Sequence, residues 1–494
     1  MKTPMTLPRI AVQPAYQYAQ IDAASHALIV LSTCDTLPAD LPQHVQWLAI
    51  LKRRKMKPKD LAKTPLALDL PDGRRLALFM ADTTLTRFER LTRLRKAAML
   101  LLDETPKQLA IWVAAGEGMS DTARDAVYVA QVNGVPLPVR KKKAVVALTQ
   151  IDLFSSLTQA DLAPVTAQAR ANILARELTA LAPNELTPAT YRKRIRSLAK
   201  GAGLSIEEFD FSRLKKMGAG AFCAVAQGSQ HEDAAIVHLS WQPKFAKKTL
   251  ALVGKGICFD TGGHNLKPAK YMAGMHEDMN GSAVALGLLL AASRQKLPLR
   301  LDVWLAVAQN HLSPEAYKQG DIVKALNGTT IEVVHTDAEG RMVLADTLTL
   351  AAKGVVGKPD LVIDFATLTG DMIVALGTRY CGIFASDALL ASDAVAAGVA
   401  SGERICAFPF DADYEEDLES KVADIKQCTL ESEADHILAA RFLKRFVGER
   451  PWLHVDLSAA NNEDGLGAVA SDQTGFGVAW GLEVLKRRLA VVAG

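Results

Sequence analysis

The sequence has few cysteines and no long apolar run. Six cysteines in 494 residues stand far apart, and no two of them form a CxxC pair. This spacing excludes a disulfide framework and a zinc ribbon, and it is typical of a reducing compartment. The longest apolar run, near residues 283–292, is too short to cross a bilayer, and the first residues lack the apolar segment of a signal peptide. We therefore expect a soluble, cytoplasmic protein without a membrane partner.

The small net charge of +3 conceals an uneven distribution. Residues 1–180 carry 24 Lys and Arg against 16 Asp and Glu, whereas residues 181–494 carry 33 against 38. The basic surplus is concentrated in Lys52–Lys59 and Arg140–Lys143. Such runs bind nucleic acid in some proteins and are solvated loops in most. No nucleic-acid-binding motif and no interleaved aromatic residues accompany them, so we expect no nucleic-acid partner. Nucleic-acid binding through the basic N-terminal domain stays an alternative function.

Strand-like and helical segments alternate along the chain, which predicts an α/β fold. In the first 165 residues, short apolar strands alternate with helices, and no polar catalytic cluster accompanies them. A long helix near 162–181 stops at Pro183, and Pro188 begins the next helix after Thr187 as its cap. We predict two domains, a smaller N-terminal α/β domain (1–165) and a larger C-terminal domain (186–494), joined by a connecting helix or linker (166–185).

The larger domain has the stronger strand signals, with helical stretches between most of them. The expected strands are 249–253, 301–307, 331–334, 361–365, 382–385 and 452–456, and the main helices are 280–293, 342–353 and 434–447. This alternation is typical of a mixed central sheet flanked by helices. Ligands of such sheets bind beyond the carboxyl ends of the strands.

Three charged residues follow the strand expected at 331–334. Asp337, Glu339 and Arg341 are two residues apart, so in extended backbone they would project to one side. Two carboxylates on one face repel each other unless a divalent metal or a shared proton lies between them. Gly340 would let the backbone pass close to a bound group. A solvated turn with a capping acid explains the same residues, so this stretch alone leaves both interpretations open.

A second polar stretch, 254–268, contains four glycines in ten residues, which predicts a loop that packs closely against another group. It holds neither GxxxxGK[ST] nor GxGxxG, so it is not a phosphate-binding loop. With Asp278, the two stretches offer five metal ligands and two free cations. The ligands are Lys255, Asp260, Asp278, Asp337 and Glu339, and the cations are Lys267 and Arg341. Four carboxylates can hold two divalent ions.

These segments resemble the signatures of the leucine aminopeptidase (cytosol aminopeptidase) family. The family pattern V-G-K-G-x-x-F-D-x-G-G-x-x-x-K-P is similar to Val253–Pro268, M-x-x-D-M-x-G to Met275–Gly281, and N-T-D-A-E-G-R-L to His335–Met342. The resemblance covers roughly residues 180–490 and implies that the domain 186–494 is a catalytic metallopeptidase domain. It implies a metal-dependent aminopeptidase that releases N-terminal amino acids, Leu- or Met-like ones preferred, from peptides by means of a water activated by two metal ions. It also implies a homohexamer.

The resemblance further implies roles for individual residues. Lys255, Asp260, Asp278 and Glu339 would hold one divalent ion, and Asp260, Asp337 and Glu339 the other, with zinc or manganese as the metals. Lys267 would stabilise the oxyanion, and Arg341 would hold a bicarbonate ion that serves as the base. The residues that resemble the family's substrate pocket are Met275, Thr367, Leu368 and Gly370.

The sequence departs from the family pattern at two places. His335 stands where the family has Asn, either as a further polar contact or as a replacement hydrogen-bonding group. Residues 429–437 lack the family's glycine-rich run, which leaves a narrow-specificity dipeptidase as an alternative. A two-metal phosphoesterase is the rival enzyme class, but such sites are rich in His and Asn ligands and seldom use lysine.

Overall fold

The computed structural model describes residues 6–13, 21, 24–142, 145–229, 232–431 and 433–490. Residues 1–5, Lys143 of the second basic run and Ser432 of the altered segment lie outside these ranges. The chain forms two compact units, one of residues 1–173 with 462–474 and one of residues 174–461 with 475–494. The division along the chain falls within helix α5 (Gln159–Thr179). The predicted α/β class, with a smaller N-terminal and a larger C-terminal part, is confirmed.

The N-terminal unit is built on a six-stranded sheet of order β1-β6-β5-β2-β4-β3, in which only the β3–β4 pairing is antiparallel. The strands are β1 (Arg9–Gln13), β2 (His26–Ser32), β3 (Leu66–Asp69), β4 (Arg75–Ala81), β5 (Gln108–Val113) and β6 (Gln150–Phe154). The main helices are α2 (His44–Arg54), α3 (Arg87–Leu102) and α4 (Met119–Asn133). The central strands are buried over nearly their whole length, as parallel strands covered on both faces must be.

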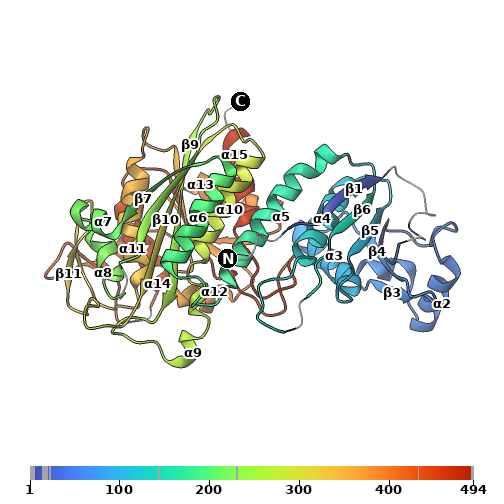
Figure 1. Ribbon diagram of the computed structural model, residues 1–494, viewed down its shortest axis with the longest axis horizontal. Helices are drawn as coiled ribbons and strands as arrows, with labels where there is room; N and C mark the ends of the chain where they lie inside the picture. The colour runs from blue at the N-terminus through green and yellow to red at the C-terminus, as the bar shows by residue number, and fades with distance from the viewer. Residues whose placement is uncertain are drawn as a thin grey trace. The chain divides into compact units, whose positions relative to one another are not determined.

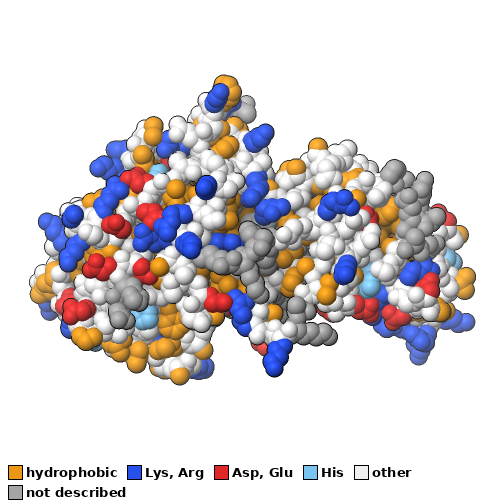
Figure 2. Space-filling view, viewed as in Figure 1, with side chains coloured by type: hydrophobic (Ala, Val, Ile, Leu, Met, Phe, Trp, Pro, Cys, Tyr) orange, Lys and Arg blue, Asp and Glu red, His pale blue; other side chains and the backbone are white. Residues whose placement is uncertain are grey.

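The basic run Lys52–Lys59 spans the end of α2 and the turn that follows it. All of its Lys and Arg side chains are exposed, and Figure 2 shows such side chains scattered over the surface of the molecule. Lys52, Arg53 and Arg54 lie in the last turn of α2, where the helix dipole favours positive charge. A solvated helix end therefore accounts for this part of the run.

The C-terminal unit has an eight-stranded mixed sheet of order β15-β14-β17-β13-β9-β10-β8-β7. Figure 1 labels three of its strands, β7, β9 and β10. Its strands are β7 (Ser205–Asp210), β8 (Ala235–Trp241), β9 (Thr249–Asp260), β10 (Arg300–Asn310), β13 (Leu361–Ala366), β14 (Cys381–Ala385), β15 (Ile405–Ala407) and β17 (Trp452–Asp456). The central strands β17, β13, β9 and β10 are parallel, so their carboxyl ends meet at one edge.

Helices cover both faces of this sheet. They include α6 (Pro188–Ala202), α8 (Gly220–Ala226), α10 (Asn280–Arg294), α11 (Glu339–Lys353), α13 (Ala388–Ser401), α14 (Asp435–Val447) and α15 (Val478–Ala490). A separate small sheet holds β11 (Ile322–Lys324), β12 (Thr330–Glu332) and β16 (Ile425–Lys426). The predicted start of α6 is confirmed, because Pro188 is its first residue and the Thr187 hydroxyl accepts the N–H of Thr190. Among the described residues, no helix combines the length and apolar character needed to cross a bilayer.

The prediction that residues 254–263 form a glycine loop is wrong for its first half. Strand β9 continues to Asp260, and Gly254 and Gly256 lie inside it. A Cβ on Gly254 would stand 2.5 Å from the Cα of Ser282, so helix α10 packs directly on the strand backbone. The loop begins at Thr261 and contains Gly262 and Gly263, both with left-handed backbone (φ +86° and +66°).

Asp346 on α11 accepts hydrogen bonds from two segments that are distant from it in the sequence. Its buried carboxylate accepts the backbone N–H of Phe222 in α8 at 2.8 Å and that of Leu326, after β11, at 2.7 Å. Burial outweighs these hydrogen bonds and raises the pKa of Asp346 to about 6, against an ordinary value of 3.8.

We expect Asp346→Asn to alter how the stability depends on pH. As the pH falls from about 6 towards 3.8, folded wild-type protein takes up a proton on Asp346 before the unfolded chain does. Wild type should therefore gain about 3 kcal/mol in free energy of unfolding relative to the variant over this interval, and lose it again as the pH rises. Urea unfolding of both proteins across this range measures the difference, and a difference that does not vary with pH would contradict the expectation.

Candidate metal centre

The predicted metal ligands meet at the carboxyl end of β9, although they come from four separate segments. Lys255 and Asp260 lie on β9, and Asp278 follows the short 3-10 helix η2 (Met275–Glu277). Asp337 lies in the turn before α11, and Glu339 is the first residue of that helix. All of these side chains are buried except that of Asp337, which is about a quarter exposed.

Two lysines connect the carboxylates. The Nζ of Lys255 lies 2.8 Å from Asp278 Oδ1 and 2.8 Å from Glu339 Oε1. The Nζ of Lys267 lies 3.0 Å from Asp260 Oδ2 and 2.5 Å from Asp337 Oδ1. The interpretation of Lys267 as a free cation is therefore wrong. Burial lowers the pKa of Lys255, but the neighbouring carboxylates outweigh burial and raise it above the usual lysine value.

Three of the carboxylates are close enough to one another to bind the same divalent ion. Asp260, Asp337 and Glu339 each offer an oxygen, and these atoms all lie within 4.8 Å of one another. Burial raises the pKa of the carboxyls of Asp260, Asp278 and Asp337, because water is removed from several like charges at once. Within the described part of the chain, Asp278 Oδ2 and Glu339 Oε2 are buried without a hydrogen-bond donor. Buried acceptors of this kind call for a partner, and a hard divalent cation is the partner that oxygen ligands suit best.

Neighbouring groups fix the orientation of these carboxylates. Asp260 Oδ1 accepts the side-chain amide of Asn310 and the backbone N–H of Gly262, both at 2.8 Å. Asp278 Oδ1 accepts the hydroxyl of Thr367 at 2.7 Å. The backbone oxygen of Thr367 in turn accepts Lys255 Nζ at 3.0 Å. Fixed supports of this kind hold metal ligands in one geometry.

Gly340 allows the start of α11 to approach Lys255. A Cβ at this position would lie 2.7 Å from both Cε and Nζ of Lys255 and 2.9 Å from Leu368 Cδ1. The close approach expected at Gly340 is therefore made to a lysine side chain of the same chain, while an approach to a bound group stays a prediction.

Of the four residues expected in the substrate pocket, Thr367 contacts a predicted ligand, and a pocket role stays a prediction for all four. Met275 begins η2, three residues before Asp278, and is half-buried. Leu368 is half-buried, and its N–H donates to Asp456 Oδ1 at 3.0 Å. Gly370 is exposed and begins α12 (Gly370–Leu376). Thr367 touches Asp278 directly, as described above, so it also supports a predicted ligand.

Arg341 does not join this cluster, and the expectation that it projects beside Asp337 and Glu339 is wrong. Strand β12 ends at Glu332, and helix α11 begins at Glu339. In a helix, residues two apart do not face each other. Arg341 Nη2 instead lies 2.8 and 2.9 Å from the two carboxylate oxygens of Asp435, and Nη1 donates to the backbone oxygen of Gln427 at 2.9 Å. Arg341 is thus not a free cation, and the expected bicarbonate ion does not fit its present contacts.

His335 acts as a hydrogen-bonding group within the turn. Its Nδ1 accepts the backbone N–H of Asp337 at 3.2 Å, which places the ring proton of the neutral side chain on Nε2. The backbone of His335 is held by the side chain of Gln427, whose Nε2 donates to the His335 oxygen at 3.0 Å. This contact agrees with the interpretation of His335 as a replacement hydrogen-bonding residue.

Asp435 and Gln427 are residues of this neighbourhood that the sequence interpretation did not select. The departure of segment 429–437 from the family pattern was the available signal, because it placed an acid at the start of α14. Gln427 is fully buried and carried no such signal. Its backbone oxygen and side chain connect Arg341 to the turn at His335.

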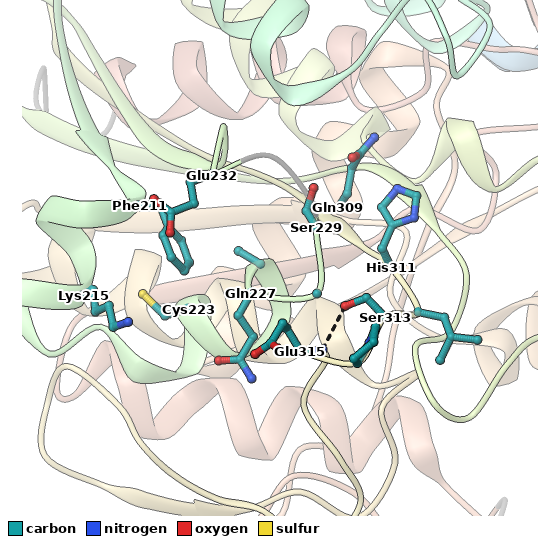
Figure 3. Close-up of a pocket in the computed structure, with 14 residues that line it drawn as sticks. Phe211, Lys215, Cys223, Gln227, Ser229, Glu232, Gln309, His311, Ser313 and Glu315 are labelled. Atoms are coloured by element: carbon teal, nitrogen blue, oxygen red, sulfur yellow. Dashed lines mark hydrogen bonds between the residues drawn. The ribbon is translucent and has the colours of Figure 1, made fainter.

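A separate cavity of about 960 Å³ lies in the same unit (Figure 3). Its described lining includes Lys215, Cys223, Glu232, His311 and Glu315, and none of the predicted metal ligands. The metal centre and this cavity are therefore different places.

Comparisons with known proteins agree with the family resemblance. A family model described as "Cytosol aminopeptidase family, catalytic domain" matches residues 173–480. A probable cytosol aminopeptidase of Afipia carboxidovorans is 39% identical over 64% of this chain and 62% of its own length. One of Roseiflexus castenholzii is 43% identical over 59% of each. The match thus spans about three fifths of these curated relatives.

Two solved structures are similar over nearly the whole chain. The bottromycin maturation enzyme BotP in complex with Mn has 31% identity and a TM-score of 0.82, covering 94% of this chain and 99% of that one. Leucyl aminopeptidase from Leishmania major in complex with actinonin has 25% identity and a TM-score of 0.82, covering 97% and 95%. With the family model matching more than half of its residues, the chain belongs to the cytosol aminopeptidase family.

Proposed function

We propose that this chain is a metal-dependent aminopeptidase that removes N-terminal amino acids, Leu- or Met-like ones preferred, from peptides. The observation that carries the proposal is the cluster of four carboxylates and Lys255, buried except at Asp337, with Asp278 Oδ2 and Glu339 Oε2 lacking donors. The names of the relatives, probable cytosol aminopeptidase, support the activity and a cytosolic location. The family resemblance supports a homohexamer.

Two divalent ions would be held by these residues. Lys255, Asp260, Asp278 and Glu339 would bind one, and Asp260, Asp337 and Glu339 the other. Zinc and manganese both suit this donor set, and the Mn complex of BotP supports manganese. When bound, such ions polarise a carbonyl group and lower the pKa of a water molecule. Lys255 binds a metal only as the neutral amine, so an arginine could not replace it.

Other side chains of the cluster would act on the substrate directly. Lys267 is the more exposed of the two lysines, at 15%, and it pairs with Asp260 and Asp337, so it would become available to a bound peptide when these carboxylates hold metal ions instead. Placed beside the scissile carbonyl, it would stabilise the negative charge that develops on that oxygen. Met275 and Leu368 would supply apolar surface for the first side chain of the substrate, with Thr367 and Gly370 completing the pocket. No bicarbonate ion takes part in the proposed reaction, because Arg341 already pairs with Asp435.

The proposal predicts that hydrolysis requires both a metal and a free α-amino group. Protein loaded with Mn²⁺ or Zn²⁺ should hydrolyse leucyl-p-nitroanilide, and a chelator should abolish the reaction. N-acetyl-leucyl-p-nitroanilide, the matched control, should not react, because its blocked amine cannot bind a metal. Absorbance of released p-nitroaniline measures both reactions. Equal hydrolysis of the two substrates, or none of either with any metal, would refute the aminopeptidase proposal.

A further inference from the structure

The guanidinium group of Arg341 is enclosed and largely satisfied by protein acceptors. Its side chain is 2% exposed. One terminal nitrogen donates to both oxygens of Asp435, and the other donates to the backbone oxygen of Gln427. Burial lowers the pKa of Arg341, and the carboxylate of Asp435 outweighs burial and raises it. The positive charge of Arg341 is therefore matched by one negative charge of the chain itself.

The backbone before α14 directs Asp435 towards Arg341. Ala434 has left-handed backbone (φ +55°), a conformation that residues with a Cβ rarely adopt. The N–H of Asp435 donates to Asp371 Oδ2 at 3.1 Å, which fixes the first turn of the helix. An acid at a helix start also suits the helix dipole. The dipole alone does not explain why the carboxylate makes two contacts with an arginine 94 residues earlier in the chain.

A carboxylate and a bicarbonate ion offer an arginine the same group, a planar pair of oxygens that carries one negative charge. A bicarbonate ion at Arg341 would have to displace Asp435 or lie beside its like charge. Asp435 is part of the same chain as Arg341, so their pairing does not cost the translational entropy that a free bicarbonate ion would lose on binding.

We propose that Asp435 is a built-in anion on Arg341 that takes the place of exogenous bicarbonate, so that peptide hydrolysis by this chain does not require bicarbonate. This inference rests on the proposed aminopeptidase function. Asp435 pairs with Arg341, which lies two residues after Glu339 on α11, and its carboxylate would take over the role that the family resemblance gives to bicarbonate at this arginine. The altered segment 429–437 would then supply the Asp435 carboxylate in place of a bicarbonate ion.

The test compares wild type with Asp435→Ala in carbonate-free buffer, before and after bicarbonate is added against an equal amount of chloride. Wild-type hydrolysis of leucyl-p-nitroanilide should not respond to bicarbonate. Asp435→Ala should be slower by about 10- to 100-fold and should recover most of this loss with bicarbonate. Asp435→Asn keeps the shape of the side chain without its charge, so it should be slow and should not recover.

Glu433→Ala, an exposed change two residues away, is the matched control and should behave as wild type. A second readout does not depend on hydrolysis: line broadening of ¹³C-bicarbonate by metal-free protein should be seen with Asp435→Ala and not with wild type. Stimulation of wild type by bicarbonate would overturn the inference, as would a folded Asp435→Ala variant that keeps full activity or is not rescued. If no protein hydrolyses the substrate, the aminopeptidase proposal fails, and the NMR result still decides whether Asp435 fills the anion site.

Discussion

Glu339→Gln is expected to reduce the hydrolysis of leucyl-p-nitroanilide by about 1,000-fold or more, which corresponds to about 4 kcal/mol of transition-state stabilisation. Glu339 is one of two carboxylates, with Asp260, proposed to contribute to both metal positions, and it also pairs with Lys255 at 2.8 Å. An amide of the same shape is a weak ligand for a hard cation, so both metal positions should be weakened by a single change. Steady-state kinetics and the metal content of dialysed protein measure the two effects.

Glu332→Gln is the matched control for this change. Glu332 lies on β12, where its side chain accepts the hydroxyl of Ser420 at 2.6 Å, a contact that glutamine can keep. We expect near-wild-type activity and metal content from this variant. Circular dichroism separates loss of ligand from loss of fold. A folded Glu339→Gln protein with full metal content and activity would remove Glu339 from the site.

Gly254→Val is expected to lower the free energy of unfolding by about 3 kcal/mol or more, and to reduce activity through the neighbouring Lys255. The nearest atoms to an added Cβ are backbone atoms: Ser282 Cα at 2.5 Å, and Gly281 O and Ser282 N at 2.8 Å. Backbone cannot rotate away as a side chain can, so strand and helix must separate, and overpacking of a core carries a cost of this size. Urea unfolding measures the change, and Gly254→Ala should have a smaller effect of the same sign.

Gly201→Ala provides a control of opposite sign. Gly201 lies in α6, is exposed, and has no atom within 4 Å of an added Cβ. Alanine favours the helix by about 1 kcal/mol over glycine, so this change should stabilise the protein. If Gly254→Val and Gly201→Ala left stability equally unchanged, close packing at Gly254 would not be the reason for its glycine.

The fold could be predicted well where hydrophobic pattern and chain breaks agree. The strand expected at 452–456 and the helix expected at 280–293 match β17 (Trp452–Asp456) and α10 (Asn280–Arg294) closely. Strand β9 was predicted too short, because glycine signals a turn in local terms. Its glycines are instead required because helix α10, which comes later in the sequence, packs against the strand. A local sequence pattern does not contain this long-range contact.

The site was predicted as far as the family motifs reach. Lys255, Asp260, Asp278, Asp337 and Glu339 do lie together, while their metal-binding roles stay a prediction. Arg341 was misplaced because the spacing was interpreted in extended backbone, whereas the helix begins at Glu339. Its partner Asp435 is 94 residues away, and only the fold brings the two together.

The contact between β9 and the start of α10 leaves no layer of side chains between two parts of the metal centre. Lys255 and Asp260 project from the strand, and Asp278 lies two residues before the first residue of the helix. Side chains that repack can absorb a change of a few tenths of an ångström, but abutting backbones cannot. Backbone packing therefore fixes the distance between these candidate metal donors. A metal site here would favour ions whose radius suits that distance.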